Sequence, residues 1–170
     1  MTRWLAALLL VAPACEKKKA EPPPVLCTEI GCRSGVELKI GTFAAADVTP
    51  NASATAAIEV CLNKQCAPMP LRQLPSKAAA VFLDGVINPD VSASANVDVV
   101  PPDMISVEVS VQGEPRAFKD GDVYRVTIKS ADNRVLSDRS WSVDTYRLTQ
   151  PNGPKCEPTC AQPKTLTELK

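Results

Sequence analysis

Apolar and polar residues alternate over several short stretches of the chain. The clearest is Val36-Glu-Leu-Lys-Ile40, in which Val36, Leu38 and Ile40 point to one face. A period of two is typical of a β-strand that buries one face against a core. Similar period-two or short apolar patterns occur at residues 56–62, 79–83, 105–111 and 123–128.

Clusters of Pro, Gly, Asn and Asp separate these stretches, as turns do. They lie at Thr49-Pro-Asn51, Asp84-Gly85, Asn88-Pro-Asp90, Pro101-Pro-Asp103, Asp120-Gly121 and Asp132-Asn133. No stretch has a convincing helical period with caps, although residues 75–80 can form one short turn. Many short strands with frequent turns predict an all-β fold, an antiparallel β-sandwich rather than an α/β sheet.

The first 14 residues have a different pattern. Arg3 precedes an apolar run over residues 5–12, and small residues stand at Ala12 and Ala14. This is the layout of a secretory signal peptide. A run of about eight apolar residues is too short to cross a membrane, which takes about 20 helical residues. We therefore expect a leader over residues 1–14 that is cleaved.

Cys15 follows the small residues directly, in the stretch Ala12-Pro13-Ala14-Cys15. This stretch resembles the processing site of bacterial lipoproteins, with Ala12 in place of the usual Leu. The resemblance implies that Cys15 becomes the lipid-modified N-terminus. Plain secretory cleavage after Ala14 is the alternative. Two or three acyl chains would hold the protein persistently on a membrane without spanning it.

Residues 15–26 read as a tether. Lys17, Lys18 and Lys19 suit either contact with anionic headgroups or a solvated linker. Pro22, Pro23 and Pro24 favour extended polyproline II geometry, which makes a semi-rigid spacer. The remaining residues, 27–170, are long enough for one domain with its own core, and no shift in composition divides them.

Composition excludes several function classes. Arg3 is the one basic residue in the leader, which leaves 18 basic against 19 acidic residues. Because these charges nearly cancel, the protein has no net positive electrostatic field that would attract nucleic acid. The chain has no His, so a Ser-His-Asp or Cys-His triad within it is impossible. Nucleotide-binding, nucleophile-elbow and zinc-protease motifs are missing as well. We expect no enzyme and no cofactor.

With Cys15 lipidated, the remaining six cysteines form an even set in an oxidising compartment, which predicts three disulfides. Cys61 and Cys66 flank a two-residue turn at Asn63-Lys64. Such a hairpin places them opposite each other at a non-hydrogen-bonded site, where side chains approach closely. We therefore predict a Cys61–Cys66 bond.

Spacing decides less about the other four, Cys27, Cys32, Cys156 and Cys160. Local bonds, Cys27 to Cys32 and Cys156 to Cys160, are the favoured interpretation. The alternative joins the first pair to the second and clamps the two ends of the domain together. A zinc site is disfavoured because no CxxC spacing occurs, and we predict no metal ligands.

Asp120-Gly-Asp-Val-Tyr124-Arg-Val126 resembles the tyrosine corner of immunoglobulin-like domains. The resemblance implies an immunoglobulin-like sandwich in which the Tyr124 hydroxyl bonds to upstream backbone. Val126 occupies the place of the second cysteine, which excludes an antibody-type domain. An ordinary Asp-Gly turn before a strand is the alternative. Trp141 is expected in the core rather than on an exposed ligand platform.

Carboxylates are the remaining candidates for chemistry. Asp84, Asp90, Asp120 and Asp122 lie at expected turns, where such side chains commonly bond to nearby backbone. Asp120 and Asp122 are also the best oxygen ligands for a calcium ion, although their spacing is not that of an EF-hand. Only six aromatic residues follow the leader. A core of this size needs most of them, which disfavours a sugar-binding platform.

The sequence thus indicates a lipoprotein anchored to a bacterial membrane on its extracytoplasmic side, the outer membrane or cell surface rather than the inner membrane. Its single disulfide-stapled domain would be a non-catalytic binding or structural module of the cell envelope. The alternatives are a carboxylate-dependent hydrolase and a docking module for another envelope protein. Ligand and oligomeric state are not fixed by the sequence.

Overall fold

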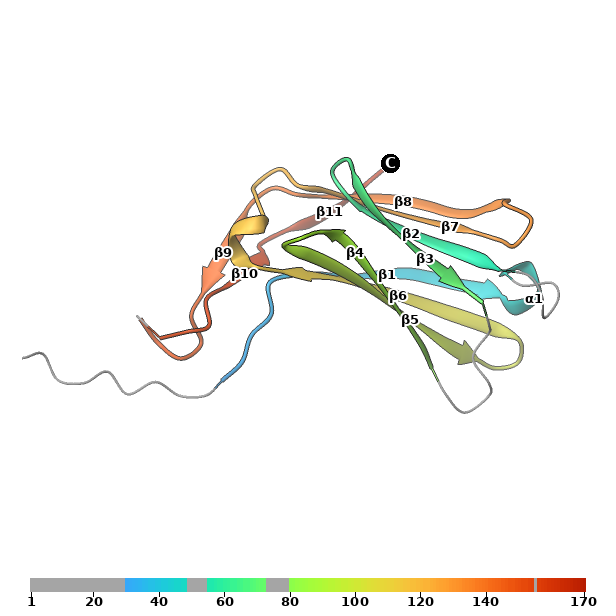
Figure 1. Cartoon of the computed structure of the whole chain (residues 1–170), viewed down its shortest axis with the longest axis horizontal. Coiled ribbons are helices and arrows are strands. Elements are labelled where there is room, and N and C mark those ends of the chain that lie inside the picture. Colours follow the sequence, from blue (N-terminus) through green and yellow to red (C-terminus); the bar gives the residue numbers. More distant parts are fainter. Residues whose placement is uncertain (1–29, 49–54, 73–79, 155) are drawn as a thin grey trace, which may run out of the picture.

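The structure is a computed structural model that describes residues 30–48, 55–72, 80–154 and 156–170. The leader, Cys15, the tether and Cys27 lie outside these residues. The described part is built from strands, with one short α-helix and one 3-10 turn (Figure 1). In chain order the elements are β1 (Gly35–Ala44), α1 (Ala45–Val48), β2 (Ala56–Leu62), β3 (Gln65–Leu71), β4 (Val81–Asn88), β5 (Val91–Val100), β6 (Met104–Gly113), η1 (Pro115–Ala117), β7 (Val123–Lys129), β8 (Val135–Val143), β9 (Tyr146–Thr149), β10 (Cys160–Pro163) and β11 (Leu166–Leu169).

Four strands form one antiparallel sheet, here called sheet A, in the order β1-β6-β5-β4. The turns at Asn88-Pro-Asp90 and Pro101-Pro-Asp103 connect β4, β5 and β6 in sequence, as predicted. Along β1, Val36, Leu38 and Ile40 are buried while Glu37 and Lys39 are exposed. The alternation in the sequence therefore corresponds to one face on the core and one on solvent.

Five strands form the second antiparallel sheet, sheet B, in the order β11-β8-β7-β2-β3. The two sheets lie one over the other in Figure 1, and their buried side chains belong to one hydrophobic cluster. A short hairpin of β9 and β10 sits at the end of the domain where the described chain begins. The predicted all-β, antiparallel architecture is confirmed.

The order of the strands differs from that of a constant-type immunoglobulin domain. There the first strand pairs with the second. Here β1 pairs with β6, and β2 pairs with β3 and β7. The immunoglobulin-like identity therefore stays a prediction.

Two local predictions need correction. The sequence Asp84-Gly85 was expected to form a turn, but both residues lie inside β4. A Cβ atom on Gly85 would come within 2.9 Å of the Ala67 side chain and 3.0 Å of the Met69 side chain of β3. The glycine is needed because β4 packs directly on β3, which is the other common reason for a glycine in a strand.

The second correction concerns residues 91–100, for which no strand was predicted. They form β5, whose inward residues include the small Ala93 and Ala95. The weak hydrophobicity of these positions concealed a regular alternation. The possible turn at residues 75–80 lies almost wholly outside the described residues.

The disulfide between Cys61 and Cys66 is confirmed. The two cysteines pair across the β2–β3 hairpin with their Cα atoms 4.0 Å apart. The local pairing of the terminal cysteines is wrong, because Cys32 is bonded to Cys160, 128 positions away, with a Cα–Cα distance of 6.1 Å. Cys156 is also disulfide-bonded. The predicted role of Cys27 lies outside the described residues.

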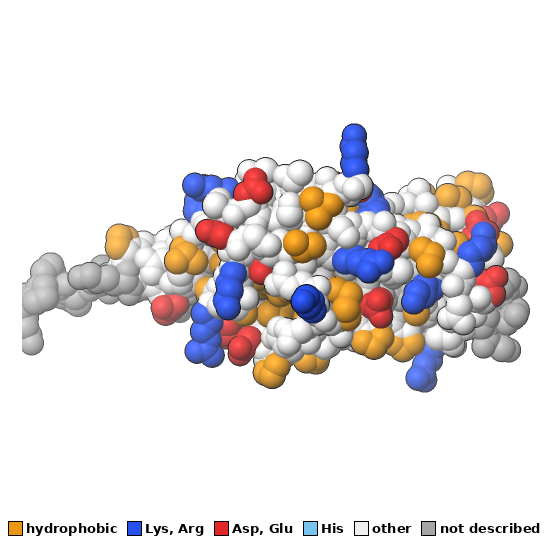
Figure 2. All heavy atoms as spheres, turned by 90° about the horizontal axis from the view of Figure 1, so that it is seen from above, with side chains coloured by type: hydrophobic (Ala, Val, Ile, Leu, Met, Phe, Trp, Pro, Cys, Tyr) orange, Lys and Arg blue, Asp and Glu red, His pale blue; other side chains and the backbone are white. Residues whose placement is uncertain are grey.

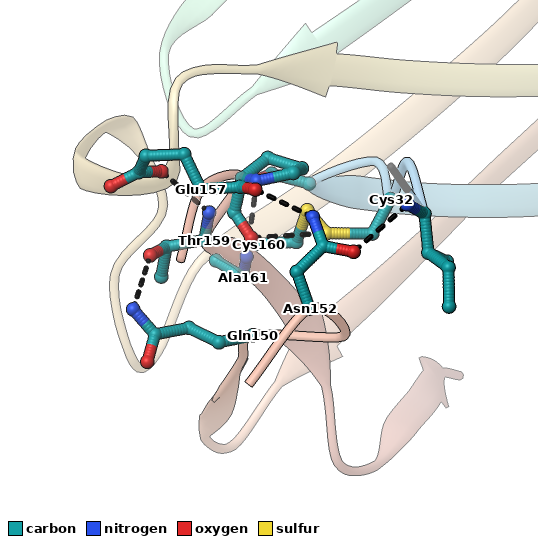
Figure 3. The surroundings of a disulfide bond; sticks show 10 residues. Cys32, Gln150, Asn152, Glu157, Thr159, Cys160 and Ala161 are labelled. Atoms are coloured by element: carbon teal, nitrogen blue, oxygen red, sulfur yellow. Dashed lines mark hydrogen bonds between the residues drawn. A yellow bond between two sulfur atoms is a disulfide. The ribbon is translucent and has the colours of Figure 1, made fainter. Parts of the chain in front are cut away.

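Hydrogen bonds around the Cys32–Cys160 bond explain why the two ends of the domain meet (Figure 3). The Ala161 amide donates to the Ser34 hydroxyl at 3.0 Å, and the Ile30 amide donates to Asn152 Oδ1 at 2.8 Å. The Asn152 side chain also donates to the Glu157 carbonyl at 2.5 Å. The segment before β1 is thus held against β10 by contacts that no local spacing encodes.

Candidate functional site

The Asp120–Tyr124 motif is structural. Tyr124 is fully buried, and its hydroxyl lies 2.5 Å from the hydroxyl of Tyr146. The partner is thus a side chain rather than the upstream backbone that the tyrosine-corner resemblance implied. Burial raises the pKa of both phenols above its ordinary value. They stay protonated and serve as a hydrogen-bonded pair in the core.

Both aspartates of this motif are held by hydrogen bonds from the protein. Asp122 is buried and accepts bonds from the Lys119 amide at 2.9 Å and the Asn63 side chain at 3.0 Å. Asp120 accepts a bond from the Tyr146 amide at 2.7 Å. These contacts tie the loop before β7 to its neighbours. They agree with a structural role rather than with a calcium site.

Two further sequence candidates have ordinary places. Trp141 is buried among core residues, as predicted, and the guanidinium carbon of Arg139 lies 5.2 Å from its ring centroid. Asp90 stands in the turn between β4 and β5, where its amide donates to Asn88 Oδ1 at 3.0 Å. Asp90 also lies 3.9 Å from the guanidinium of Arg116, which gives it an ion-pair partner on the surface.

One group of side chains on the β2–β3 hairpin has the spacing of metal ligands. The ligand atoms of Glu59, Cys61 and Cys66 lie within 4.8 Å of one another. The two sulfur atoms are joined in a disulfide, however, and a disulfide does not supply the thiolates that bind metals. We therefore regard the Cys61–Cys66 bond as a structural cross-link of the hairpin.

A hollowed surface lies on the solvent-facing side of sheet A, called here the outer face of sheet A. A short row, Asp98-Ser106-Thr42, crosses β5, β6 and β1, and three longer rows each run from β4 through β5 and β6 to β1. The longer rows are Val86-Ser92-Gln112-Gly35, Asp84-Ser94-Ser110-Glu37 and Phe82-Asn96-Glu108-Lys39. With strands about 4.8 Å apart, the face is about 14 Å wide.

Small polar side chains line the middle of this face and long or apolar side chains line its borders. Ser92, Ser94 and Ser110 occupy the two central strands. Phe82 and Val86 stand out from β4 with 71% and 72% of their surface exposed. Two adjoining hollows of about 500 and 470 Å³ lie over the face.

The outer face of sheet A continues into a groove beside the Cys32–Cys160 bond. This end groove has a volume of about 770 Å³ and carries Arg33, Glu114, Arg116 and Glu157 along its walls. Gln112 lines the end groove and both hollows on the face. The two regions therefore form one continuous surface centred on the end of β6.

The solvent-facing side of sheet B has another character. Arg125 donates two hydrogen bonds to Asp138, at 2.7 and 2.5 Å, and Thr127 donates a third at 3.3 Å. The guanidinium holds the pKa of Asp138 below its usual range. Figure 2, which views the molecule from the sheet B side, shows acidic and basic side chains interspersed over this surface. Within the Arg125–Asp138 and Arg139–Glu168 pairs of this sheet, the opposite charges neutralise each other.

The charged side chains on the outer face of sheet A differ from those of sheet B in their ion pairing. Among the described residues, the ion pairs involve neither the carboxylates of this face nor Lys39. The Gln112 side chain donates to the Ser110 hydroxyl at 2.7 Å, which fixes both along the floor. The face can therefore bind a ligand through hydroxyl, amide and carboxylate groups, and we take it as the candidate functional site.

The sequence did not predict this face because it did not predict β5. This strand contributes small polar side chains to the middle of the face. Strict alternation in Val91-Ser-Ala-Ser-Ala-Asn-Val97 was the available signal. Counting Ala as an inward residue would have revealed it. The exposure of Phe82 had no signal in the sequence, because it depends on which face of β4 turns outward.

No helix in the described ranges combines the length and apolar character needed to cross a membrane. Neither a protein-family model, nor a curated protein, nor a solved structure matches this chain. The proposed function therefore depends on the residues and geometry described above.

Proposed function

We propose that this protein is a lipoprotein anchored on the extracytoplasmic side of a bacterial membrane, and that its domain is a non-catalytic binding module of the cell envelope. The observation that carries the binding role is the outer face of sheet A. It presents a hollow floor of small polar groups next to two exposed apolar side chains, Phe82 and Val86. Ligand sites combine a hollow, apolar side chains and a few placed polar groups, and this face offers all three.

The location is supported by two independent features. The disulfides Cys32–Cys160 and Cys61–Cys66 are compatible with an oxidising, extracytoplasmic compartment. The signal-like segment before Cys15 supplies the route and the anchor. The immunoglobulin-like part of the proposal concerns the mode of action: a rigid two-sheet body that presents faces, edges and end loops for recognition.

A hydrolase would need two convergent, partly buried carboxylates in a cleft. The carboxylates on the outer face of sheet A are Glu37, Asp84, Asp98 and Glu108. Asp98 alone is half-buried, and the other three are exposed. Exposure leaves water around these three and so removes the usual means of tuning a carboxylate into a general acid. The geometry therefore favours binding over hydrolysis.

Metabolic labelling tests the anchor. Cells that express the chain are supplied with radiolabelled palmitate, and the label on the protein and its place in membrane fractions are measured. We expect label and membrane retention, both lost in Cys15→Ala. The Cys61→Ala, Cys66→Ala double variant is the matched control and should keep both. An unlabelled wild-type protein would overturn the anchored part of the proposal.

An affinity experiment tests the binding role. The purified full chain is immobilised and exposed to detergent-solubilised envelopes, and the retained material is analysed for proteins and for sugars. Ser110→Arg places a long charged side chain on the floor of the face and should abolish retention. Ser140→Arg on β8 of sheet B should not. Equal retention by wild type and Ser110→Arg would contradict a role for this face.

A further inference from the structure

Phe82 is the exception among the aromatic residues of the domain. Five of the six aromatic side chains after the leader belong to the core or pack against it: Phe43, Phe118, Tyr124, Trp141 and Tyr146. Phe82 is 71% exposed on β4. The core therefore uses the aromatics as the composition indicated, apart from the one that borders the outer face of sheet A.

The floor next to Phe82 is rich in groups that both donate and accept hydrogen bonds. Ser92, Ser94 and Ser110 each carry a hydroxyl, and Asn96 and Gln112 carry amides. Their small size leaves the hollow of about 470 Å³ between Phe82 on one border and Lys39 on the other. A ligand that fits this floor should itself be rich in groups that donate and accept.

Charges on the face argue against a strongly charged ligand. Glu37, Asp84, Asp98 and Glu108 share the face with Lys39 and Arg33, so both signs are present and acidic groups are in excess. A polyanion would meet four carboxylates, and a polycation would meet two basic groups. A neutral ligand meets neither penalty.

One row of the face also contains an unsatisfied polar atom. Asn96 Oδ1 is shielded from solvent and lacks a hydrogen-bond partner, whereas the Asn96 amide nitrogen donates to Asp98 at 2.8 Å. Asn96 lies directly opposite Phe82 in the register of β4 and β5. An unpartnered buried acceptor costs stability, and such costs are expected where a surface serves a function rather than the fold.

An extended peptide is a poorer match than a polyhydroxylated chain. Peptides that bind to β-sheets usually add a strand at an edge, where main-chain groups are free. The outer face of sheet A is the side of a sheet, and its floor has polar groups instead of the apolar pockets that take peptide side chains. Sugar rings, in contrast, offer hydroxyls on their rim and C–H groups on their faces.

We infer that the outer face of sheet A binds a neutral oligosaccharide chain. The exposed ring of Phe82 packs on the C–H groups of one sugar ring. The hydroxyls and amides of β5 and β6 bind the sugar hydroxyls, and the exposed carboxylates accept further hydrogen bonds. This inference rests on the proposed binding role and gives that role a ligand class.

The test uses the purified full chain in detergent and a panel of neutral hexasaccharides built from glucose, mannose, xylose or N-acetylglucosamine. Binding is measured by isothermal titration calorimetry, with a hexamer of galacturonate as the acidic comparison. We expect at least one neutral hexasaccharide to bind more tightly than the acidic one. Phe82→Ala should weaken that binding about tenfold, as the loss of one stacked ring would.

A second variant, at Ser110, tests the floor of the face independently of Phe82. Ser110→Val keeps a strand-forming side chain but removes a hydroxyl from the floor, and it should also weaken binding about tenfold. The matched controls are Leu148→Ala, an apolar residue on β9 that is 66% exposed, and Ser140→Val on β8. Both should bind as the wild type does, and thermal unfolding should show all four variants folded.

The inference is overturned if no neutral hexasaccharide binds, or if binding persists unchanged in both Phe82→Ala and Ser110→Val. Stronger binding of the galacturonate hexamer would overturn it as well. Failure of the wider binding role looks different. If the panel gives no binding but the immobilised chain retains an envelope protein in a Ser110-dependent manner, the ligand class is wrong and the binding role stands.

Discussion

Asp122 shows how one buried charge can organise a loop. Its carboxylate accepts hydrogen bonds from the Lys119 amide and from the side chain of Asn63 at the tip of the β2–β3 hairpin. Asn63 in turn accepts a bond from the Val123 amide at 3.0 Å. Through these bonds a single side chain joins the hairpin tip, the loop after η1 and the start of β7.

Replacing Asp122 by Ala should therefore lower the free energy of unfolding by about 2–3 kcal/mol, the usual cost of losing hydrogen bonds to a charged group. Urea denaturation measures this loss. Asp122→Asn keeps one acceptor oxygen and should lose less. A change of less than about 0.5 kcal/mol in Asp122→Ala would show that water replaces the carboxylate at no cost.

Glu168 gives a prediction about pH. Arg139 donates two hydrogen bonds to its carboxylate, at 2.7 and 2.5 Å, and thereby holds the pKa of Glu168 below its ordinary value. A folded-state pKa below the unfolded value adds stability above about pH 4.3, and this stability is lost as the pH falls through the folded-state pKa. Acidification should therefore lower the melting temperature of the wild type.

In Glu168→Gln this contribution is missing, so the melting temperature should fall less between about pH 5 and about pH 3. Arg139→Gln should reduce the fall to a similar extent, and combining the two changes should add little for this pair. Melting curves across this range provide the measurement. A Glu168→Gln variant with the same acid-side slope as the wild type would refute the coupling.

At the residue scale the sequence was a good guide where a side chain's role depends on its neighbours along the chain. The placing of Trp141 in the core and the register of Cys61 with Cys66 are confirmed. The hydroxyl partner of Tyr124 was wrong because Tyr146 reaches it from a strand 22 positions away. Contacts of that kind depend on how strands stack, which local spacing does not encode.

At the scale of elements, β3 is an edge strand that is protected against further pairing. Leu62 and Gln65 flank the two-residue turn and form a hydrogen-bonded pair. Alternation along the hairpin then places Pro68 and Pro70 at positions whose nitrogen faces away from β2. Because proline has no N–H, this outer edge lacks two donors that another strand would need.

Restoring these donors should promote association of the protein with itself. We expect the double variant Pro68→Thr, Pro70→Thr to form dimers or larger species that the wild type does not form at the same concentration. Sedimentation velocity measures the distribution. Pro68→Lys, Pro70→Lys restores the same N–H groups but adds charge to the edge, so it should remain unassociated.

If the threonine variant sediments as the wild type does, the prolines are not what protects this edge. The sequence predicted the β2–β3 hairpin well because turn residues and two cysteines mark it. It did not predict β5, whose inward positions between Val91 and Val97 are the small residues Ala93 and Ala95. An element with a weak hydrophobic signal is recognised only when its neighbours in the sheet are known.

At the scale of the whole molecule, the Cys32–Cys160 bond joins the beginning and end of the described domain. Spacing along the chain favoured local bonds, because a pairing over 128 positions leaves no mark in a single sequence. Contacts between β1 and β10 bring the two cysteines together. The even number of cysteines thus allowed a disulfide between the two ends of the domain, but it did not decide between that bond and local ones.

Digestion of the purified chain without reduction, followed by mass spectrometry, should find Cys32 and Cys160 in one cross-linked pair of peptides. Cys61 and Cys66 should remain within a single looped peptide. The peptide that contains Cys160 should be released on reduction. A direct bond between Cys156 and Cys160 would contradict the closure of the domain described here.

The closure also determines how the molecule bears mechanical load. A pull on the backbone at residue 30 reaches the Cys32–Cys160 bond before it reaches β1. The Cys32–Cys160 disulfide therefore carries the tension between the two ends of the chain. Residues 33–159 lie in the loop that this bond closes, and they bear none of the tension. Strands of both sheets inside that loop cannot be peeled off from either end while the bond holds. Under tension between its two ends, the domain would keep sheet A intact at forces that unravel an open chain.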